Sequence, residues 1–403
     1  MNTPFDIIIV GANMVGATLA CALADSGLKL LLIDAQPAAP AWPEGSYDVR
    51  VSALTTTSSQ ILSRLGVWPT LVKERSSPFR TLRVWNEDAA AKLVFDSADI
   101  GLPYLGHIVE NRRIQQALLQ ALSYRRNIEV RLGCALETLE VGHNHSIVGT
   151  SDQQTQSARL VVGADGRQSK VRQLARIATT AWSYQQHAIV AHVRTELPHQ
   201  QSAWQRFLSS GPLAFLPLDD GRSSIVWSVD DSDAERLMAM DKDAFESALS
   251  QALQYALGHV SLDSERLSFP LMAQYAHHYV APRIALVGDA AHGIHPLAGQ
   301  GVNLGLLDAA CLAEVIEQLQ RSERDIGSEQ SLRKYQRWRK GSNLAMLAAT
   351  DGLNKLFSNN HSAIHWLRNK GLALTQAVPG LTPWFMQFAA GKDADLPTLA
   401  RSQ

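Results

Sequence analysis

The sequence predicts an α/β protein in which a sheet of mainly parallel strands is interleaved with a second, strand-rich region and followed by a helical C-terminal region. Three apolar runs each lead into a glycine-containing turn, at residues 11–16, 164–166 and 288–301. Short alternating stretches that suit strands fill much of the intervening chain. With 403 residues, 46% of them hydrophobic and 19% charged, the chain can bury cores for two or more domains.

The first of these turns lies between two apolar runs that suit buried parallel strands. The run "FDIIIV" is short and β-branched, and "MVGATLACALADSG" has helical spacing with a predicted helix end at Gly27. A second run, "LKLLLIDA", ends in Asp34, which follows Gly11 by 23 positions and is placed to bind adenosine ribose hydroxyls. The order of strand, turn, helix, strand and acid predicts a Rossmann-like, nucleotide-binding βαβ unit.

One position departs from the G-x-G-x-x-G pattern of such units. Gly11 and Gly16 are present, but Asn13 replaces the middle glycine. Asparagine tolerates a left-handed backbone better than other non-glycine residues, at a cost of roughly 1–2 kcal/mol. We therefore expect Asn13 in that conformation, with its side chain turned away from the phosphates or bonded to them. Taken alone, this motif also permits an ordinary βαβ unit without a ligand.

The other two turns favour the ligand-binding interpretation. Residues 159–172, "RLVVGADGRQSKVR", carry Asp165 just after an apolar strand. Residues 284–308, "IALVGDAAHGIHPLAGQGVNLGLLD", place Asp289 at a strand end, where it suits sugar-like hydroxyls, and predict a helix that begins near Gly301. The positive end of that helix favours an electron-rich group. Together the turns predict a site for a long ligand.

Charge and cysteine content exclude several classes of protein. Thirty-seven basic and 38 acidic residues leave a formal net charge of -1, which provides no broad field for nucleic acid or anionic lipid. The three cysteines are too few and too far apart for a disulfide framework, a zinc site or an iron–sulfur cluster, so we predict a cytoplasmic protein. Residues 7–24 lack charge, but Asp6 precedes them and no basic residue precedes Lys29, which argues against a membrane span or signal peptide.

The three motifs in this order resemble those of the group A flavoprotein monooxygenases, which are FAD-dependent aromatic hydroxylases, and the resemblance covers nearly the whole chain. Other stretches resemble the ubiquinone-biosynthesis branch of that family. They are "DVRVSALTTTSSQILSRLGVW" (48–68), "LGHIVENRRIQQAL" (105–118), "GPLAFLPL" (211–218) and "SIVWSV" (224–229). Within the branch, "WSYQQHAIVAHVRTELPH" (182–199) and the C-terminal region are most similar to 2-polyprenylphenol hydroxylases.

The resemblance implies a set of cofactor-binding residues. Gly11, Gly16 and Asp34 would hold the ADP half of FAD, with altered packing at Asn13, where the branch commonly has glycine. Asp289 would bind the ribitol chain, and the backbone of Gly301, Val302 and Asn303 would lie against the pyrimidine edge of the flavin. Arg50 and Asn111 would face the cofactor, and Asp165 belongs to a motif linked with both FAD and the NAD(P)H donor.

Simpler interpretations of the same residues remain open. Asp165 and Asp289 are also typical of aspartates that cap turns, and Arg50 of a surface ion pair. His292 and His295 more often satisfy backbone carbonyls in such a loop than hold a metal, and no metal site is predicted. His187 and His192 are expected to be half-buried sheet residues.

The resemblance also implies a reaction. NAD(P)H would reduce FAD, and the reduced flavin would react with O2 to give a C4a-hydroperoxide that hydroxylates the ring of a polyprenylated phenol in ubiquinone biosynthesis. The sequence identifies no catalytic base. Three alternatives remain: a different ring position or phenolic substrate, a flavin dehydrogenase or reductase that inserts no oxygen, and a non-catalytic scaffold of the quinone-synthesis assembly.

The predicted FAD-binding domain comprises residues 1–70, 100–180 and 282–340, and the substrate-binding sheet domain comprises 71–99 and 181–281. Residues 341–403 are predicted to be helical, with apolar and aromatic residues at positions 366, 367, 372, 384, 385 and 388. That tail either packs on the FAD-binding domain as a helix pair or meets the inner-membrane surface or other quinone-synthesis proteins. In the second case the protein would be peripheral to the membrane.

Overall fold

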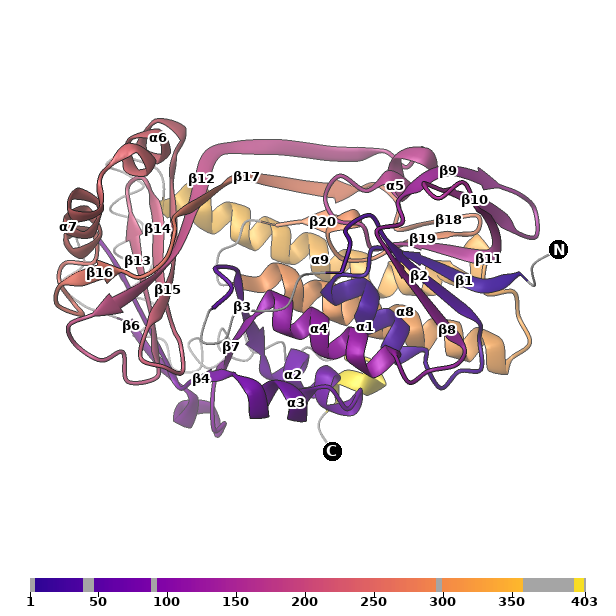
Figure 1. Ribbon diagram of the computed structural model, residues 1–403, viewed down its shortest axis with the longest axis horizontal. Helices are drawn as coiled ribbons and strands as arrows, with labels where there is room; N and C mark the ends of the chain where they lie inside the picture. The colour runs from indigo at the N-terminus through magenta and orange to yellow at the C-terminus, as the bar shows by residue number, and fades with distance from the viewer. Residues whose placement is uncertain (1–3, 39–46, 88–92, 295–298, 358–394, 402–403) are drawn as a thin grey trace.

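The computed structural model describes residues 4–38, 47–87, 93–294, 299–357 and 395–401. Its strands form an eight-stranded first sheet, a nine-stranded second sheet and a small third sheet of three strands. The first and second sheets lie at opposite ends of the molecule, with helices α8 and α9 running between them (Figure 1). The α/β fold predicted from the sequence is confirmed.

The first sheet is built around strand β1, which pairs in parallel with β2 on one side and β11 on the other. Its central order is β18-β19-β11-β1-β2-β8, and β9 and β10 extend it beyond β11. The strand bounds are β1 Phe5–Val10, β2 Leu30–Asp34, β8 Ile128–Leu132, β9 Leu136–Val141, β10 Ser146–Thr150, β11 Thr155–Gly163, β18 Val280–Ala281 and β19 Ile284–Leu286. Because β1, β2, β11 and β19 are parallel, the three glycine-containing turns meet at one edge of the sheet.

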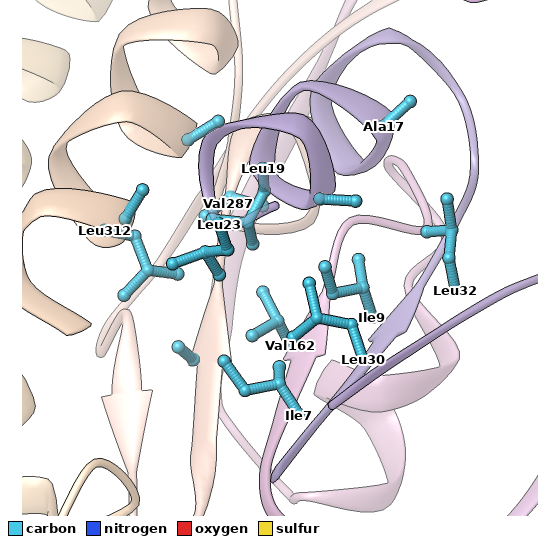
Figure 2. Packing of buried hydrophobic residues seen from close by; sticks show 14 of the residues in the cluster. Ile7, Ile9, Ala17, Leu19, Leu23, Leu30, Leu32, Val162, Val287 and Leu312 are labelled. Atoms are coloured by element: carbon cyan, nitrogen blue, oxygen red, sulfur yellow. The ribbon is translucent and has the colours of Figure 1, made fainter. Parts of the chain in front are cut away.

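Helix α1 (Met14–Ala22) packs between this sheet and helix α8 (Gln300–Arg321), and also contacts α4 (Asn111–Leu122). Figure 2 shows Leu19 and Leu23 pointing into the apolar layer that contains Ile7 and Ile9 of β1. Burying each such side chain contributes about 1.5–3 kcal/mol. This apolar layer holds the carboxyl end of β1 against the start of α1.

Helix α1 is shorter than the sequence predicted. It ends at Ala22, not near Gly27. Leu23 N–H still bonds to the Leu19 carbonyl, four residues back, but Ala24 N–H bonds to the Cys21 carbonyl at 3.2 Å, three residues back. Ser26 N–H then bonds to the Leu23 carbonyl at 3.1 Å, so the chain continues as turns. Gly27 has a positive φ of 77° and ends that turn, not the helix.

The second sheet has the order β20-β17-β12-β15-β14-β13-β5-β6, with β16 paired to β12. Its bounds are β5 Thr81–Asn86, β6 Leu93–Asp96, β12 Thr179–Thr195, β13 Ser202–Leu208, β14 Gly211–Pro217, β15 Ser223–Asp230, β16 Val260–Leu262, β17 Leu267–Ala276 and β20 His292–Gly293. The predicted strands "TLRVW", "HAIVAHV" and "SSIVWSV" lie within β5, β12 and β15, "LAFLPL" overlaps β14, and the described residues of "KLVFD" form β6. Strands β12 and β17 run along the top of the molecule and join the two ends (Figure 1).

The two faces of the second sheet have different neighbours. Helices α6 (Asp231–Ala239) and α7 (Lys242–Ala252) cover one face, where Ile189, Phe215 and Trp227 are buried. Because side chains alternate along a strand, Ala188, Val190 and Val226 lie on the other face. That face is directed toward the first sheet, and it forms one wall of the cavity described below.

The third sheet has three strands, and the remaining helices complete the described fold. Strand β7 (Gly106–Glu110) pairs with β3 (Val51–Thr55) and β4 (Ser77–Phe79). The other elements are α2 Thr56–Arg64, α3 Trp68–Glu74, η1 Ser97–Ile100, α5 Lys170–Leu174, η2 Gly288–Ala290, α9 Glu329–Phe357 and η4 Thr398–Ala400. Residues 341–357 of the predicted helical region lie in α9, and the apolar residues singled out in the tail lie outside the described residues.

The chain crosses between the two large sheets more often than the predicted domain boundaries suggest. Strand β12 already begins at Thr179, and β20 joins the second sheet although residues 282–340 were assigned to the FAD-binding domain. The domain boundaries therefore stay a prediction. No helix among the described residues is long and apolar enough to cross a membrane.

Candidate functional site

A cavity of about 490 Å³ lies where the first and third sheets meet the inner face of the second sheet. Its volume falls within the range of small-molecule and cofactor sites. The polar part of its lining comprises Asn13, Arg50, Ser52, Asn111, Arg167, Ser224 and Asp289. The apolar part includes Ala188, Val190, Val226, Phe269, Leu271 and Ile294. The cavity is thus polar on the side of the glycine turns and mainly apolar on the side of the second sheet.

The turn after β1 is closed so tightly that only glycine fits at two positions. Gly11 has a φ of 105°, and a Cβ on it would lie 2.3 Å from the Ala164 carbonyl oxygen. A Cβ on Gly16 would lie 1.9 Å from the Gly11 carbonyl oxygen. Both glycines therefore set how closely α1 approaches β1 and β11. This packing brings the N-terminus of α1 to the cavity, which Asn13, Met14 and Val15 line.

The prediction of a left-handed backbone at Asn13 is wrong. Asn13 has φ -80° and ψ -175°, which is an extended conformation, and it is the N-cap of α1. Its Oδ1 accepts the Met14 N–H at 2.7 Å. Asparagine is one of the preferred N-cap residues, so this position carries none of the strain that we expected. The side chain is exposed and lines the cavity at the helix N-terminus.

The two strand-end acids of the first sheet both bond to backbone amides. Asp34 accepts the Ala12 N–H at 2.6 Å through Oδ2 and the Gln36 N–H at 2.8 Å through Oδ1. Asp165 Oδ2 accepts the N–H groups of Lys170 and Val171 in the first turn of α5, whose N-cap is Ser169. Asp165 Oδ1 is buried without a hydrogen-bond partner among the described residues. Neither side chain lines the cavity, and their contacts with a nucleotide stay predictions.

The third glycine-rich turn places its residues in two different environments. Asp289 is exposed and lines the cavity. Gly301 and Val302, at the start of α8, are half-buried and also line it. Asn303 is buried, and its side chain bonds to the β3–α2 segment: Oδ1 accepts the Thr55 N–H at 3.0 Å, and Nδ2 donates to the Ala53 carbonyl at 2.9 Å. Asn303 therefore fixes α8 against the third sheet, a contact that sequence reasoning missed.

Arg50 and Asn111 both line the cavity: Arg50 directly precedes β3, and Asn111 begins α4, directly after β7. The Arg50 guanidinium lies over the Phe269 ring, 5.5 Å from its centroid, and makes no ion pair among the described residues. Asn111 Oδ1 accepts the Ser52 hydroxyl at 2.6 Å. Sequence reasoning missed Arg167, a second cation in the lining. Its position directly after Asp165-Gly166 was the available signal, because that turn leads to the cavity.

The comparisons with known proteins agree with this geometry. A family model described as an FAD binding domain matches residues 4–350. The chain is 37% identical to a 3-demethoxyubiquinol 3-hydroxylase of Escherichia coli over 97% of this chain and 99% of that protein. It is 38% identical to the ubiquinone hydroxylase UbiL of Rhodospirillum rubrum, over 96% of this chain and 89% of that protein. The chain belongs to the ubiquinone-biosynthesis branch of the FAD-dependent aromatic monooxygenases.

The fold is also that of solved flavin monooxygenases. The crystal structure of the p-nitrophenol 4-monooxygenase PnpA from Pseudomonas putida matches with a TM-score of 0.78 at 17% identity, over 98% of this chain and all of that chain. As an FAD monooxygenase, this protein needs room for a cofactor with a long diphosphate and a flavin ring. The cavity fits that need, because the N-termini of both α1 and α8 face it and favour anionic groups.

A buried polar cluster supports the turn that carries Asp289 in this FAD monooxygenase. Asp308 of α8 is fully buried and accepts the Gly288 N–H at 3.1 Å and His292 Nε2 at 2.5 Å. It also accepts Arg339 Nε at 2.7 Å and Asn343 Nδ2 at 3.1 Å, both from α9. The cations beside it outweigh the effect of burial and hold the pKa of Asp308 well below its usual range.

This cluster corrects the expectation for the histidines of the flavin loop. His292 bonds to the Asp308 carboxylate, not to a backbone carbonyl, and its ring lies 5.9 Å from that of Tyr279. His295 lies outside the described residues. The described ranges contain no group of three His, Cys, Asp or Glu side chains placed to hold a metal ion. Sequence reasoning missed Asp308, Arg339 and Asn343, because only the packing of α8 on α9 brings them together.

Proposed function

We propose that this FAD monooxygenase hydroxylates the aromatic ring of a polyprenylated phenol in ubiquinone biosynthesis, with NAD(P)H as electron donor and O2 as oxidant. The observation that carries the proposal is the two-sided cavity, in which cofactor-side residues face the mainly apolar inner face of the second sheet. An apolar wall suits a ring with a hydrocarbon tail. The names of the E. coli and R. rubrum relatives support the same class of substrate.

Residues at different positions around the cavity would bind different parts of the cofactor and the substrate. The N-terminus of α1 would bind the diphosphate, the Asp289 side chain would bind the ribitol hydroxyls, and the N-terminus of α8 would face the flavin ring. FAD, once bound and reduced, supplies the activation of O2. Ala188, Val190 and Val226 would hold the phenol ring against the flavin and exclude water from it.

The first test is anaerobic reduction of the protein's flavin by NADPH, with and without a short-chain 2-prenylphenol. We expect the phenol to accelerate bleaching and, after O2 is admitted, to gain one oxygen atom by mass spectrometry. Acceleration without oxygen insertion would support a flavin reductase instead. A protein that cannot be loaded with FAD would overturn the proposal and support the scaffold alternative.

A matched pair of variants links the reaction to the apolar wall. Val226→Phe fills the cavity from the second sheet, so it should retain FAD and lose most of the phenol-dependent acceleration. Val94→Phe is the control, because Val94 is 46% exposed on β6 and does not line the cavity. Equal acceleration in both variants would place the phenol elsewhere.

The ring position requires a comparison of substrates. We propose C–H hydroxylation of a 2-polyprenylphenol, on the similarity of residues 182–199 to that group. The E. coli relative is named for a different substrate, 3-demethoxyubiquinol. Short-chain analogues of 2-polyprenylphenol and of demethoxyubiquinol, offered together, would separate the two by the NMR spectrum of the product. Preference for the second analogue would contradict the proposed substrate while retaining the reaction class.

A further inference from the structure

Tyr47 is held by charged side chains from two separate parts of the chain. The Arg75 guanidinium lies over the Tyr47 ring, 3.8 Å from its centroid, and the Arg222 guanidinium lies over the same ring at 4.3 Å. Both contacts are attractive cation–π interactions. The Tyr47 hydroxyl donates to Asp219 in the turn between β14 and β15. Burial and this hydrogen bond raise the pKa of Tyr47, so the hydroxyl keeps its proton at neutral pH. The ring therefore connects the end of α3 with the second sheet.

Carboxylates balance the charges of the two arginines. Arg222 bonds to Asp220 at 2.7 Å and to Asp263 at 2.6 Å. The Arg75 guanidinium lies 3.5 Å from Glu110, a buried carboxylate at the end of β7. Because each guanidinium has an acidic partner, the two can share one ring without a large repulsion.

Residues 47–50, which we call the strap, lie just before β3 and belong to no helix or strand. Asp48 donates its N–H to Glu110 Oε1 at 2.7 Å, and its carbonyl accepts His192 Nε2 at 2.9 Å. Asp48 Oδ1 also accepts the Arg50 N–H at 3.2 Å. Glu110 belongs to the third sheet, and His192 is a buried residue of the second sheet, not a half-buried one as expected. The strap is thus bonded to both sheets.

The strap brings two residues to the cavity, Val49 and Arg50. The Arg50 carbonyl accepts the Asn111 N–H at 3.0 Å, so the backbone of Arg50 is bonded through both its N–H and its carbonyl. The Arg50 side chain is exposed, and its guanidinium contacts the Phe269 ring from 5.5 Å. For a long, exposed side chain of this kind, a fixed backbone restricts the positions that its charge can occupy.

We propose that Tyr47 is a positioning residue, which anchors the strap so that the Arg50 guanidinium stays at the cavity and faces the bound cofactor. This inference rests on the proposed function, because it takes the cavity as the site of FAD. Arg50 would touch the cofactor, and Tyr47 would act only through Arg50.

The reduction potential of bound FAD reports the position of the Arg50 charge. A positive charge beside the cofactor favours its reduced form, which carries negative charge. Displacement of the Arg50 guanidinium therefore lowers the potential. A change that affects only the stability of the fold leaves the potential of the folded, FAD-loaded protein unchanged.

The test measures the midpoint potential of bound FAD in the wild type, Arg50→Gln, Tyr47→Leu and the double variant. We expect Arg50→Gln to shift the reduction equilibrium about tenfold, which lowers the two-electron potential by about 30 mV. Tyr47→Leu should shift the equilibrium in the same direction by about threefold, or about 15 mV. Its effect is smaller because Asp48 still bonds to Glu110 and His192.

The pattern across variants distinguishes positioning from stabilisation. The double variant should have the same potential as Arg50→Gln, because Tyr47 acts only through Arg50. Tyr47→Phe keeps the ring beside both guanidiniums and should retain most of the wild-type potential. Arg75→Met removes the nearer guanidinium and should lower the potential by less than Tyr47→Leu. Tyr124→Leu is the matched control, since Tyr124 is 78% exposed and does not line the cavity.

Failure of this inference is separable from failure of the proposed function. An unchanged potential in Tyr47→Leu, or a fall in the double variant equal to the sum of the two single falls, would overturn the positioning role. Neither result alters the hydroxylation of a phenol by the wild type. A wild type that holds FAD but hydroxylates no phenol would overturn the proposed function, and the potentials of the same variants would still decide the role of Tyr47.

Discussion

The two walls of the cavity satisfy their polar groups in different ways. On the side of the first and third sheets, Asn111 in the cavity lining, and Asp34 and Asn303 outside it, already bond to atoms of the same chain. On the wall formed by the second sheet, Ser224 Oγ has no partner, and neither does His192 Nδ1 behind it, among the described residues. The first side thus has most of its polar side chains paired within the chain, with Asp165 Oδ1 as an exception, whereas the second sheet leaves Ser224 Oγ and His192 Nδ1 unpaired among the described residues.

This difference indicates how each wall recognises its ligand. The wall of the first and third sheets, where we propose that FAD binds, is called the cofactor wall; it presents helix N-termini, and its side chains mainly hold the backbone in place. The wall of the second sheet, where we propose that the phenol binds, is called the substrate wall; it presents side chains. Mutations in the first wall should therefore act on stability and cofactor binding, whereas mutations in the second should act on the substrate step.

The largest effect should follow from Asp308→Asn in the buried cluster. It leaves Arg339, 5% exposed, without its carboxylate partner, and breaking such a pair costs about 3–5 kcal/mol. Urea unfolding of the FAD-loaded protein measures this loss of stability.

Asp25→Asn is the control, since the ion pair of Asp25 with Arg125 is largely exposed and worth under about 1 kcal/mol. Ser224→Ala should also cost little, because its hydroxyl has no partner to lose. Similar losses in Asp308→Asn and Ser224→Ala would refute the contrast between the walls.

Gly16→Ala should be the next most damaging change. The added Cβ would lie 1.9 Å from the Gly11 carbonyl oxygen, so α1 must shift away from β1, at a cost of about 3 kcal/mol and with weaker FAD binding. Flavin content and thermal unfolding report the two effects. Gly301→Ala is the matched comparison, because its Cβ meets no protein atom within 4 Å although Gly301 lines the cavity. That variant should keep its stability and change only FAD affinity, and a stability loss equal to that of Gly16→Ala would contradict the packing argument.

The Asp308 cluster also predicts a dependence of stability on acid. The folded pKa of Asp308 is lowered relative to the unfolded chain, so its contribution is fully present above the ordinary carboxyl pKa of about 3.9 and decreases as the pH falls toward the folded value. A single such carboxylate contributes on the order of 2 kcal/mol to the free energy of unfolding that is lost at acidic pH. Urea unfolding between about pH 5 and pH 2.5 should show a smaller loss of the free energy of unfolding with falling pH in Asp308→Asn than in the wild type. Equal losses in the two proteins would mean that other carboxylates dominate the acid dependence.

The smallest effect should come from Asn13→Gly, which restores the usual glycine of the turn. Asn13 is an unstrained N-cap, and exchange of asparagine for glycine at such a position changes stability by only a few tenths of a kcal/mol. If the free energy of FAD binding changes by a similar amount, the Kd for FAD shifts by less than about twofold. Asn13→Val, which loses the cap, should cost about 1 kcal/mol. A tenfold tighter Kd in Asn13→Gly would show that the asparagine side chain obstructs the cofactor.

The sequence indicated the turns on the cofactor wall more clearly than the residues of the substrate wall. Gly11, Gly16, Asp289 and the start of α8 were singled out because a close backbone approach restricts the residue type, and such restrictions are visible along a short stretch of chain. The structure brings these turns to the cavity, and their contacts with FAD stay predictions. The substrate wall has no comparable signature. His192 was expected to be an ordinary half-buried sheet residue, and its position beside Ser224 depends on how two separate strands pair.

Local sequence thus determined the βαβ unit, its parallel strands and the family to which the chain belongs, because strand and helix periodicity and glycine turns are encoded within a few residues of each other. Tertiary structure alone decided the rest. The extended backbone of Asn13 follows from its place at the start of α1, and the Asp308 cluster follows from the packing of α8 on α9. The pairing of His192 with Ser224 follows from the register of β12 with β15, which non-local hydrogen bonds determine.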